Sequence, residues 1–243
     1  MRVELIAECA TNHGGSVDLA TEFIWRFAEA GADWIKFQTT RVQHLRPDDP
    51  QYAWFQRAEL SDEAHHQLKA ECDKAGVKFL TTVYHPAEVP FVRSVCDVVK
   101  IGSGEAHEIR LGKAVREAAF RRVLVATGLT PAHRTPYHKT QSGVTFLACV
   151  TRYPCPSYYA VRAYGNDSPY LEADCWGWSD HCEGLDGARL AIGHGARIIE
   201  KHVCLPHQAR PIRPWEATVE QFQELRAFAD DDPTRFIGRW QHA

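Results

Sequence analysis

The segment Val17–Thr39, VDLATEFIWRFAEAGADWIKFQT, contains an amphipathic stretch, a glycine and an apolar run in direct succession. Apolar residues recur at helical spacing over Val17–Ala30, and Asp33–Thr39 is short and rich in β-forming residues. Between them, Gly31 can take the left-handed conformation that ends a helix. A helix followed at once by a strand is the repeating unit of parallel α/β folds.

The same succession recurs along the chain, with Gly76 and Gly195 in the place of Gly31. Apolar runs stand at Glu4–Ala10, Asp33–Thr39, Lys78–Tyr84, Val98–Ser103, Arg122–Thr127, Val144–Thr151, Cys175–Asp180 and Ala196–Cys204. Amphipathic stretches between them include Val17–Ala30, Ser61–Ala75, Ile109–Ala119, Leu185–His194 and Val219–Ala229. Eight strands in 243 residues predict an α/β fold with residues 1–243 forming one (β/α)8 TIM barrel as a single domain.

Three segments predict loops rather than helices. Leu129–Ser142 and Pro154–Asp174 are rich in Pro, Tyr, Gly and Ser, so we expect irregular fifth and sixth crossovers. His44–Gln56 predicts a further loop. In a barrel, loops at the C-terminal ends of the strands build the active site.

Composition argues against several classes of protein. The formal net charge is -3, without the basic excess that nucleic acid or an anionic membrane surface would favour. No apolar run approaches the roughly 20 residues needed to cross a bilayer. Because the first strand begins close to Met1, we expect no signal peptide and a cytoplasmic protein. The eight cysteines contain no CxxC pair, so free thiols are expected rather than disulfides or a zinc knuckle.

Polar side chains interrupt or follow the strands near their C-terminal ends. Strand side chains alternate, so Lys36 and Gln38 share one face. Any one such residue suits a paired structural role, but buried polar groups from seven strands are costly unless they pair or bind something. The joint pattern predicts a site at the barrel mouth, made by Glu8, Lys36, Gln38, Thr82, Lys100, Ser103, Glu105, Thr151, Tyr153, Ser179, His181, Glu200 and His202.

Two histidines of this set suggest a metal site. His181 and His202 lie at the ends of adjacent predicted strands, and neutral imidazoles there can share one divalent ion. We expect Mn²⁺ or Mg²⁺ rather than zinc, although Cys182 and Cys204 keep zinc open. Five of the chain's other histidines read as surface residues: His65, His66, His133, His138 and His207.

Two lysines of the set suggest an anion site. Lys36 and Lys100, with nearby hydroxyls, suit a phosphate. The alternatives are ion pairs with Glu8 and Glu105, or a Schiff-base aldolase, which also needs a strand lysine.

Several motifs resemble the N-acetylneuraminate (sialic acid) synthase family, in order and over nearly the whole chain. They are Ala7–Gly15 (AECATNHGG), Gly31–Thr39 (GADWIKFQT), Phe79–Thr82 (FLTT), Val99–Glu105 (VKIGSGE), Ala126–Gly128 (ATG), Ser179–His181 (SDH) and Ile199–His202 (IEKH).

The resemblance implies a metal-dependent condensation. Phosphoenolpyruvate attacks a sugar-like aldehyde through its C3, water adds at C2 and phosphate leaves, which yields a 3-deoxy-2-keto acid. It also implies roles for the site residues. His181 and His202 match metal ligands, and Glu105 matches the acid near C2. Phosphoenolpyruvate-binding positions match Lys36, Thr82, Lys100, Ser103 and Ser179, and positions facing the acceptor match Glu8, Gln38, Tyr153 and Glu200.

The chain departs from the family on the acceptor side. The family's small C-terminal antifreeze-like domain, which sends an arginine into the partner subunit, is expected to be absent, and a homodimer is left open. The family's Gly-Pro-Asp loop is replaced by Arg210–Pro214, Thr151-Arg152 stands where the family has asparagine, and Ala126 replaces a serine. We therefore expect an acceptor other than N-acetylmannosamine. Arg210 and Arg213 suggest an anionic acceptor or, equally, a solvated surface. A pyruvate aldolase and a non-catalytic sugar-binding remnant remain as alternatives.

Overall fold

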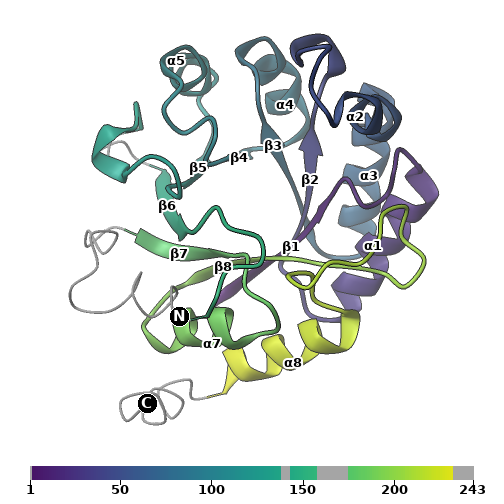
Figure 1. Ribbon diagram of the computed structural model, residues 1–243, viewed down its shortest axis with the longest axis vertical. Coiled ribbons are helices and arrows are strands. Elements are labelled where there is room, and N and C mark those ends of the chain that lie inside the picture. Colours follow the sequence, from purple (N-terminus) through teal and green to yellow (C-terminus); the bar gives the residue numbers. More distant parts are fainter. Residues whose placement is uncertain (1, 138–142, 158–174, 232–243) are drawn as a thin grey trace.

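Eight parallel strands close into a barrel in chain order, which confirms the predicted fold (Figure 1). The structure is a computed structural model that describes residues 2–137, 143–157 and 175–231. Each strand ends within two residues of its predicted bounds. The strands are β1 Glu4–Ala10, β2 Trp34–Thr39, β3 Lys78–Val83, β4 Val98–Ile101, β5 Arg122–Ala126, β6 Val144–Cys149, β7 Cys175–Asp180 and β8 Ile198–His202.

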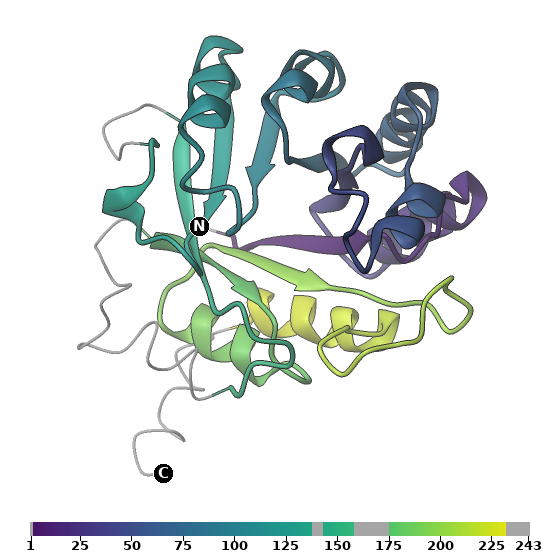
Figure 2. The same cartoon turned by 45° about the horizontal axis from the view of Figure 1, so that its top comes forward.

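Helices surround the barrel and pack their apolar faces against it (Figures 1 and 2). Ser16 and Ser61 cap the first two long helices through their side chains, and Thr218 with Gln221 forms a capping box at the last. The helices are α1 Val17–Glu29, α2 Tyr52–Ala58, α3 Asp62–Lys74, α4 Val89–Val95, α5 Ile109–Glu117, α7 Asp186–Gly193 and α8 Val219–Asp230.

Two local expectations were wrong. The segment His44–Gln56 is not wholly a loop, because α2 begins at Tyr52, and a seven-residue helix is too short to show a clear apolar period. His65 is buried rather than exposed. Its ring nitrogens lie 3.1 Å from the Thr39 hydroxyl and 2.9 Å from the Ser61 carbonyl oxygen. Burial lowers the pKa of His65 to about 4, so it is neutral.

Only part of the fifth and sixth crossovers lies among the described residues. Between β5 and residue 137 the chain forms one short 3₁₀ turn, Ala132–Arg134, in agreement with the expected irregular fifth crossover. The rest of that crossover, His138 and nearly all of the sixth crossover lie outside the described residues.

The barrel interior is layered, apolar below and polar above. Near the N-terminal ends of the strands, buried side chains from seven strands form one cluster: Ile6, Trp34, Leu80, Val98, Leu124, Leu147 and Ile198. The remaining strand, β7, contributes Gly177, where a Cβ would lie 2.8 Å from the Ile198 carbonyl oxygen. Two residues further along each strand, the same inward face continues above this layer. The polar site residues therefore stand on a tightly packed floor.

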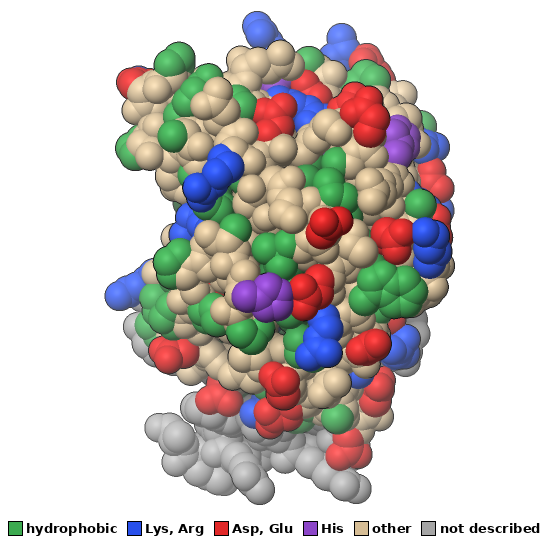
Figure 3. All heavy atoms as spheres, turned by 90° about the vertical axis from the view of Figure 1, so that its right-hand side faces the viewer, with side chains coloured by type: hydrophobic (Ala, Val, Ile, Leu, Met, Phe, Trp, Pro, Cys, Tyr) green, Lys and Arg blue, Asp and Glu red, His purple; other side chains and the backbone are tan. Residues whose placement is uncertain are grey.

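The surface charges and the cysteines can be compared with the sequence analysis, and the free thiols agree with it. The side shown in Figure 3 carries acidic and basic side chains interspersed, without a basic face. Among the described residues no helix is long and apolar enough to cross a bilayer. The described cysteines are buried and free: Cys9, Cys72, Cys96, Cys149, Cys155, Cys182 and Cys204.

A buried ion pair joins β7 to β8 on the helix-facing side of the barrel. Lys201 Nζ lies 2.8 Å from Asp180 Oδ2 and donates to the Cys182 carbonyl oxygen at 2.6 Å. Asp180 also accepts from Trp178 Nε1 at 3.0 Å. Burial alone would raise the pKa of Asp180, but attraction to Lys201 and these hydrogen bonds outweigh it and lower the pKa.

We predict that Lys201→Met lowers the free energy of unfolding by about 3–5 kcal/mol, because it leaves the Asp180 carboxylate buried without its cation. Urea denaturation followed by circular dichroism measures this. Lys113→Met is the control. It removes an exposed lysine whose Nζ lies 3.8 Å from Glu117 Oε1, and it should change the free energy of unfolding by less than about 0.5 kcal/mol. Equal effects of the two substitutions would contradict the prediction.

Candidate active site

One pocket at the C-terminal ends of the strands, here called the central pocket, is lined by all thirteen residues predicted for the site. It has a volume of about 220 Å³. The structure thus brings the predicted residues together, while their individual roles stay predictions. Strand alternation explains most of the grouping, because these residues continue the inward face above the apolar floor, whereas Ser103 and Glu105 come from the turn after β4.

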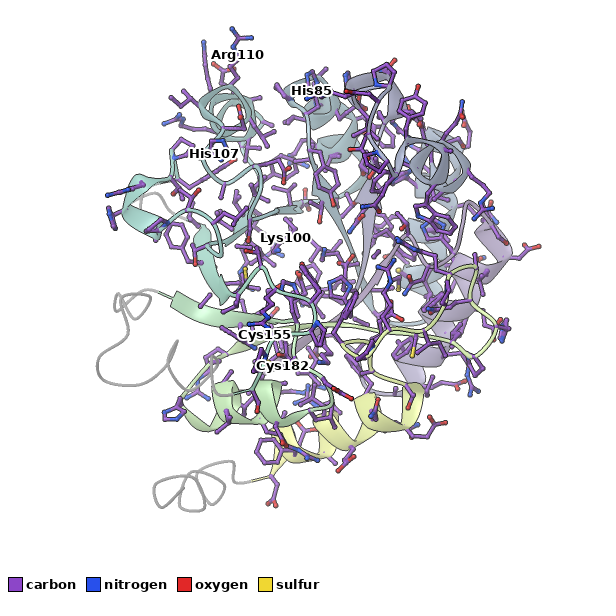
Figure 4. The ribbon with its side chains drawn as sticks, in the orientation of Figure 1. His85, Lys100, His107, Arg110, Cys155 and Cys182 are labelled. Atoms are coloured by element: carbon purple, nitrogen blue, oxygen red, sulfur yellow. The ribbon has the colours of Figure 1, made fainter. Side chains whose placement is uncertain are left out.

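Two lysines and two glutamates form a buried charge network inside this pocket. Lys36 Nζ is paired with Glu8 Oε2 and lies 3.8 Å from Glu200 Oε2. Lys100 Nζ lies 3.4 Å from Glu200 Oε1. Figure 4 shows Lys100 near the centre of the barrel, seen down the view of Figure 1. The expected pairing of a lysine with Glu8 is confirmed, whereas Lys100 pairs with Glu200 instead of Glu105.

Neighbouring polar groups complete the network. Ser179 Oγ donates to Glu200 Oε1 at 2.9 Å, and Lys36 Nζ donates to Thr82 Oγ1 at 2.9 Å. Gln38 Nε2 donates to Glu8 Oε1 at 3.3 Å. These contacts link residues of five strands, β1, β2, β3, β7 and β8, within the pocket.

The pKa values of Glu8 and Glu200 are shifted in opposite directions. Burial raises the pKa of Glu8 to about 7, with repulsion from Glu200 adding to the effect and attraction to Lys36 opposing it. Burial alone would also raise the pKa of Glu200, but attraction to Lys100 and Lys36 outweighs it and lowers that pKa to about 2. Near neutral pH the network therefore has one firmly ionised carboxylate and one that can take a proton.

Glu105 forms the wall above β4. A Cβ added to Gly102 would lie only 2.6 Å from Glu105 Oε2. Glycine at this position therefore leaves room for the Glu105 carboxyl group to fold over the end of the strand. Burial raises the pKa of Glu105, which favours its protonated form. Beside it, Ser103 Oγ accepts from the Gly128 amide at 3.2 Å and lies 2.9 Å from Cys149 Sγ.

His181 and His202 lie side by side with ring centroids 5.5 Å apart. Burial lowers the pKa of both, so both rings are neutral. His181 Nδ1 is 2.7 Å from the Val150 carbonyl oxygen, which can accept only from a protonated nitrogen. Nε2 therefore carries the lone pair, and it accepts from the Tyr153 hydroxyl at 2.9 Å.

The sequence analysis missed three residues at the mouth of the barrel. Tyr84 and Cys149 line the central pocket, and both could have been found, since each continues the inward alternation of its strand. Trp54 of α2 stacks against Arg210 from the loop after β8, and it lies in a segment that was expected to be a loop. No local pattern marked that tryptophan as part of the mouth.

A closed parallel barrel with a charged pocket at its C-terminal mouth defines the class of (β/α)8-barrel proteins that carry a site at that face. Within this class the family is also defined. The NeuB family model matches residues 23–229, and the chain belongs to the NeuB family.

Known proteins agree with this membership. The chain is 26% identical over 226 residues to N,N'-diacetyllegionaminic acid synthase of Campylobacter jejuni, covering 83% of this chain and 67% of that protein. It is 28% identical over 227 residues to the enzyme of the same name from Legionella pneumophila, covering 82% of this chain and 63% of that protein. The solved sialic acid synthetase of Leptospira borgpetersenii superposes with a TM-score of 0.87 at 24% identity, covering 97% and 85% of the two chains. The chain thus spans about two thirds of the length of the two legionaminic acid synthases.

We predict that Glu8 makes stability fall as the pH rises from about 4.5 to about 7. Its folded-state pKa is raised above the unfolded value, so its contribution is full below the unfolded pKa and is lost as the pH rises through the folded pKa. Glu8→Gln should remove this part of the profile. Urea unfolding of both proteins at about pH 5 and about pH 8 measures it, and parallel profiles would count against the assignment.

Proposed function

We propose that this chain condenses phosphoenolpyruvate with a sugar or sugar-like aldehyde, releases phosphate and forms a 3-deoxy-2-keto acid. Family membership supports the reaction class. The observation that carries the proposal is the composition of the central pocket, in which two lysines, three carboxyl groups and two neutral histidines line one small cavity. Each of these groups has a task in the reaction.

Lys36 and Lys100 bind the phosphate and carboxylate of phosphoenolpyruvate. In the absence of substrate their charges are balanced by Glu8 and Glu200, so an arriving anion exchanges partners within a network that is already buried. Ser103 and Ser179 supply hydroxyl donors beside the lysines. The substrate is thereby held by charge-assisted contacts that water reaches poorly.

The carboxyl groups stabilise developing charge and transfer protons at the reacting carbons. Bond formation through C3 of phosphoenolpyruvate leaves positive charge at C2, and an ionised carboxylate stabilises that charge. Glu200, with its lowered pKa, is suited to this electrostatic task. Glu8 and Glu105, with raised pKa values, are suited to exchange a proton with the water that adds at C2 and with the alkoxide that forms from the aldehyde.

His181 and His202 are the residues that would hold a divalent ion. Both are neutral, and His181 is oriented through its other nitrogen by a backbone carbonyl, as metal-binding histidines commonly are. Among the described residues no group of three His, Cys, Asp or Glu side chains could hold a metal. With only two protein ligands, water would complete the coordination shell, which suits the expected Mn²⁺ or Mg²⁺ better than zinc with its three or four protein ligands. Such an ion would polarise the aldehyde as a Lewis acid.

A Schiff-base aldolase fits the pocket less well. That mechanism requires a neutral lysine amine. Burial alone would lower the pKa of Lys36, but attraction to Glu200 and Glu8 outweighs it and raises the pKa, which keeps the amine protonated. A sugar-binding remnant would have no use for buried carboxylates that cost free energy. Action in the cytoplasm and assembly as a homodimer remain expectations from the sequence.

We predict that the protein releases inorganic phosphate from phosphoenolpyruvate only when an aldose is present. A screen of aldoses with a colorimetric phosphate assay tests this, and mass spectrometry identifies the 2-keto acid. Lys100→Met should raise the KM for phosphoenolpyruvate about thirtyfold, the effect of losing one charge-assisted contact of about 2 kcal/mol. Carbon–carbon bond formation from pyruvate, without phosphate, would contradict the proposal.

We predict that chelation abolishes turnover and that Mn²⁺ restores it, while circular dichroism shows the barrel still folded. His202→Ala should weaken Mn²⁺ binding at least about tenfold in calorimetry, because one of two protein ligands is lost. The control is His207→Ala, which removes an exposed ring paired with Glu22. Full activity in excess chelator, or unchanged Mn²⁺ affinity in His202→Ala, would refute the metal assignment.

A further inference from the structure

A second cavity adjoins the central pocket on the side of the loop after β8. It has a volume of about 490 Å³ and is here called the outer pocket. Three residues, Gln38, Tyr153 and His202, line both cavities, so a ligand in one meets a ligand in the other. The outer pocket is lined by Ala10, Thr11, Asn12, Gln38, Phe55, Tyr153, His202, Arg210, Arg213, Trp215 and Glu216.

The loop that closes this pocket turns its charges inward and an apolar residue outward. Arg210 and Arg213 are half-buried and line the pocket, whereas Ile212 between them is 52% exposed. This is the reverse of the usual sorting of side chains, in which arginine faces water and isoleucine is buried. The half-burial of both arginines inside the cavity favours ligand binding over the alternative that they only solvate the surface.

The guanidinium of Arg210 is held in place before any ligand binds. It lies 4.7 Å above the Trp54 ring, and its Nη1 donates to Thr11 Oγ1 at 3.2 Å. The backbone beside it is fixed by the Ala209 amide, which donates to the Asn12 carbonyl oxygen at 2.8 Å. Arg213 is similarly placed over a ring of the same loop, 5.3 Å from the Trp215 centroid. Such preorganisation reduces the entropy lost on binding.

Neither arginine has a carboxylate partner within 4.0 Å among the described residues, although one carboxylate stands nearby. Glu216 instead accepts from neutral donors, namely Asn12 Nδ2 at 3.1 Å, Gln208 Nε2 at 3.0 Å and the backbone amide of Arg213 at 3.0 Å. The contrast with Lys36 is clear, since that lysine is paired with glutamate. Two oriented cations in a cavity, neither in direct contact with a carboxylate of the described residues, form a binding site for an anion.

We propose that the acceptor aldehyde carries an anionic group, a phosphate or a carboxylate, at the end remote from its carbonyl, and that Arg210 and Arg213 bind this group. The inference rests on the proposed function. The lysines in the central pocket take the anions of phosphoenolpyruvate, the shared residues Tyr153 and His202 lie where the two substrates meet, and the arginines take the acceptor's charge. The aromatic walls of Trp215 and Phe55 suit the carbon skeleton between.

Binding is tested first with acceptor analogues that lack an aldehyde group and cannot react. Calorimetry with sorbitol 6-phosphate, gluconate and sorbitol should show at least about tenfold tighter binding of one anionic analogue than of sorbitol. Arg210→Gln and Arg213→Gln should each weaken the binding of that anionic analogue about tenfold, whereas Lys100→Met should bind it as tightly as the unaltered protein. Arg46→Gln, which alters an exposed arginine paired with Asp48, is the matched control. Loss in Lys100→Met with retention in both arginine variants would overturn the inference.

Turnover then separates this inference from the reaction itself. With phosphoenolpyruvate, mannose 6-phosphate or mannuronate should exceed mannose in kcat/KM at least about tenfold, and N-acetylmannosamine should be a poor acceptor. Arg210→Gln should act mainly through the KM of the acceptor. Equal use of neutral and anionic aldoses would overturn the inference and leave the condensation intact. Anion binding at the arginines without phosphate release from any aldehyde would refute the proposed reaction instead.

Discussion

The Glu200 carboxylate, buried between two lysines, is the interaction on which the rest of the barrel mouth depends. It stands on an apolar layer, lies 3.4 Å from Lys100 and 3.8 Å from Lys36, and accepts from Ser179. A carboxylate in that position would be costly without both cations, and the cations would be costly without it. Each strand that contributes to the network is thereby held in register with its neighbours, since a slip of one residue would turn its charge into the outer core.

In the proposed reaction, this network would also allow the central pocket to exchange its own carboxylates for the anionic groups of phosphoenolpyruvate. Bringing a substrate with two anionic groups to an unpaired pair of buried lysines would require those lysines to wait in a low dielectric without partners. Pairing with Glu8 and Glu200 balances the lysine charges, but these carboxylates then compete with the ligand for the lysines. The raised pKa of Glu8 eases the competition, because a proton can neutralise that carboxylate when its lysine turns to the substrate.

The two cavities differ in how they balance charge, and the difference matches their depth. The two lysines lie deep in the central pocket, 3% exposed, where an unpaired charge would be prohibitive. The arginines lie on a half-buried loop, where stacking on Trp54 and Trp215 and access to water allow them to stand without a carboxylate. Selectivity for one substrate can thus change by rewriting a loop, while the chemistry stays with the strands.

From the sequence alone one could predict the eight strands, the closed barrel and the thirteen residues that share the central pocket, because strand periodicity is a local property and barrel closure brings all strand ends to one mouth. Tertiary structure alone decided which charges meet. Lys100 pairs with Glu200, one hundred positions away, and not with nearby Glu105, because opposite walls of a closed barrel face each other. It likewise decided that His65 is buried, that α2 brings Trp54 under Arg210 and that the β8 loop turns its arginines inward. Each of these depends on contacts between distant segments, which no local pattern encodes.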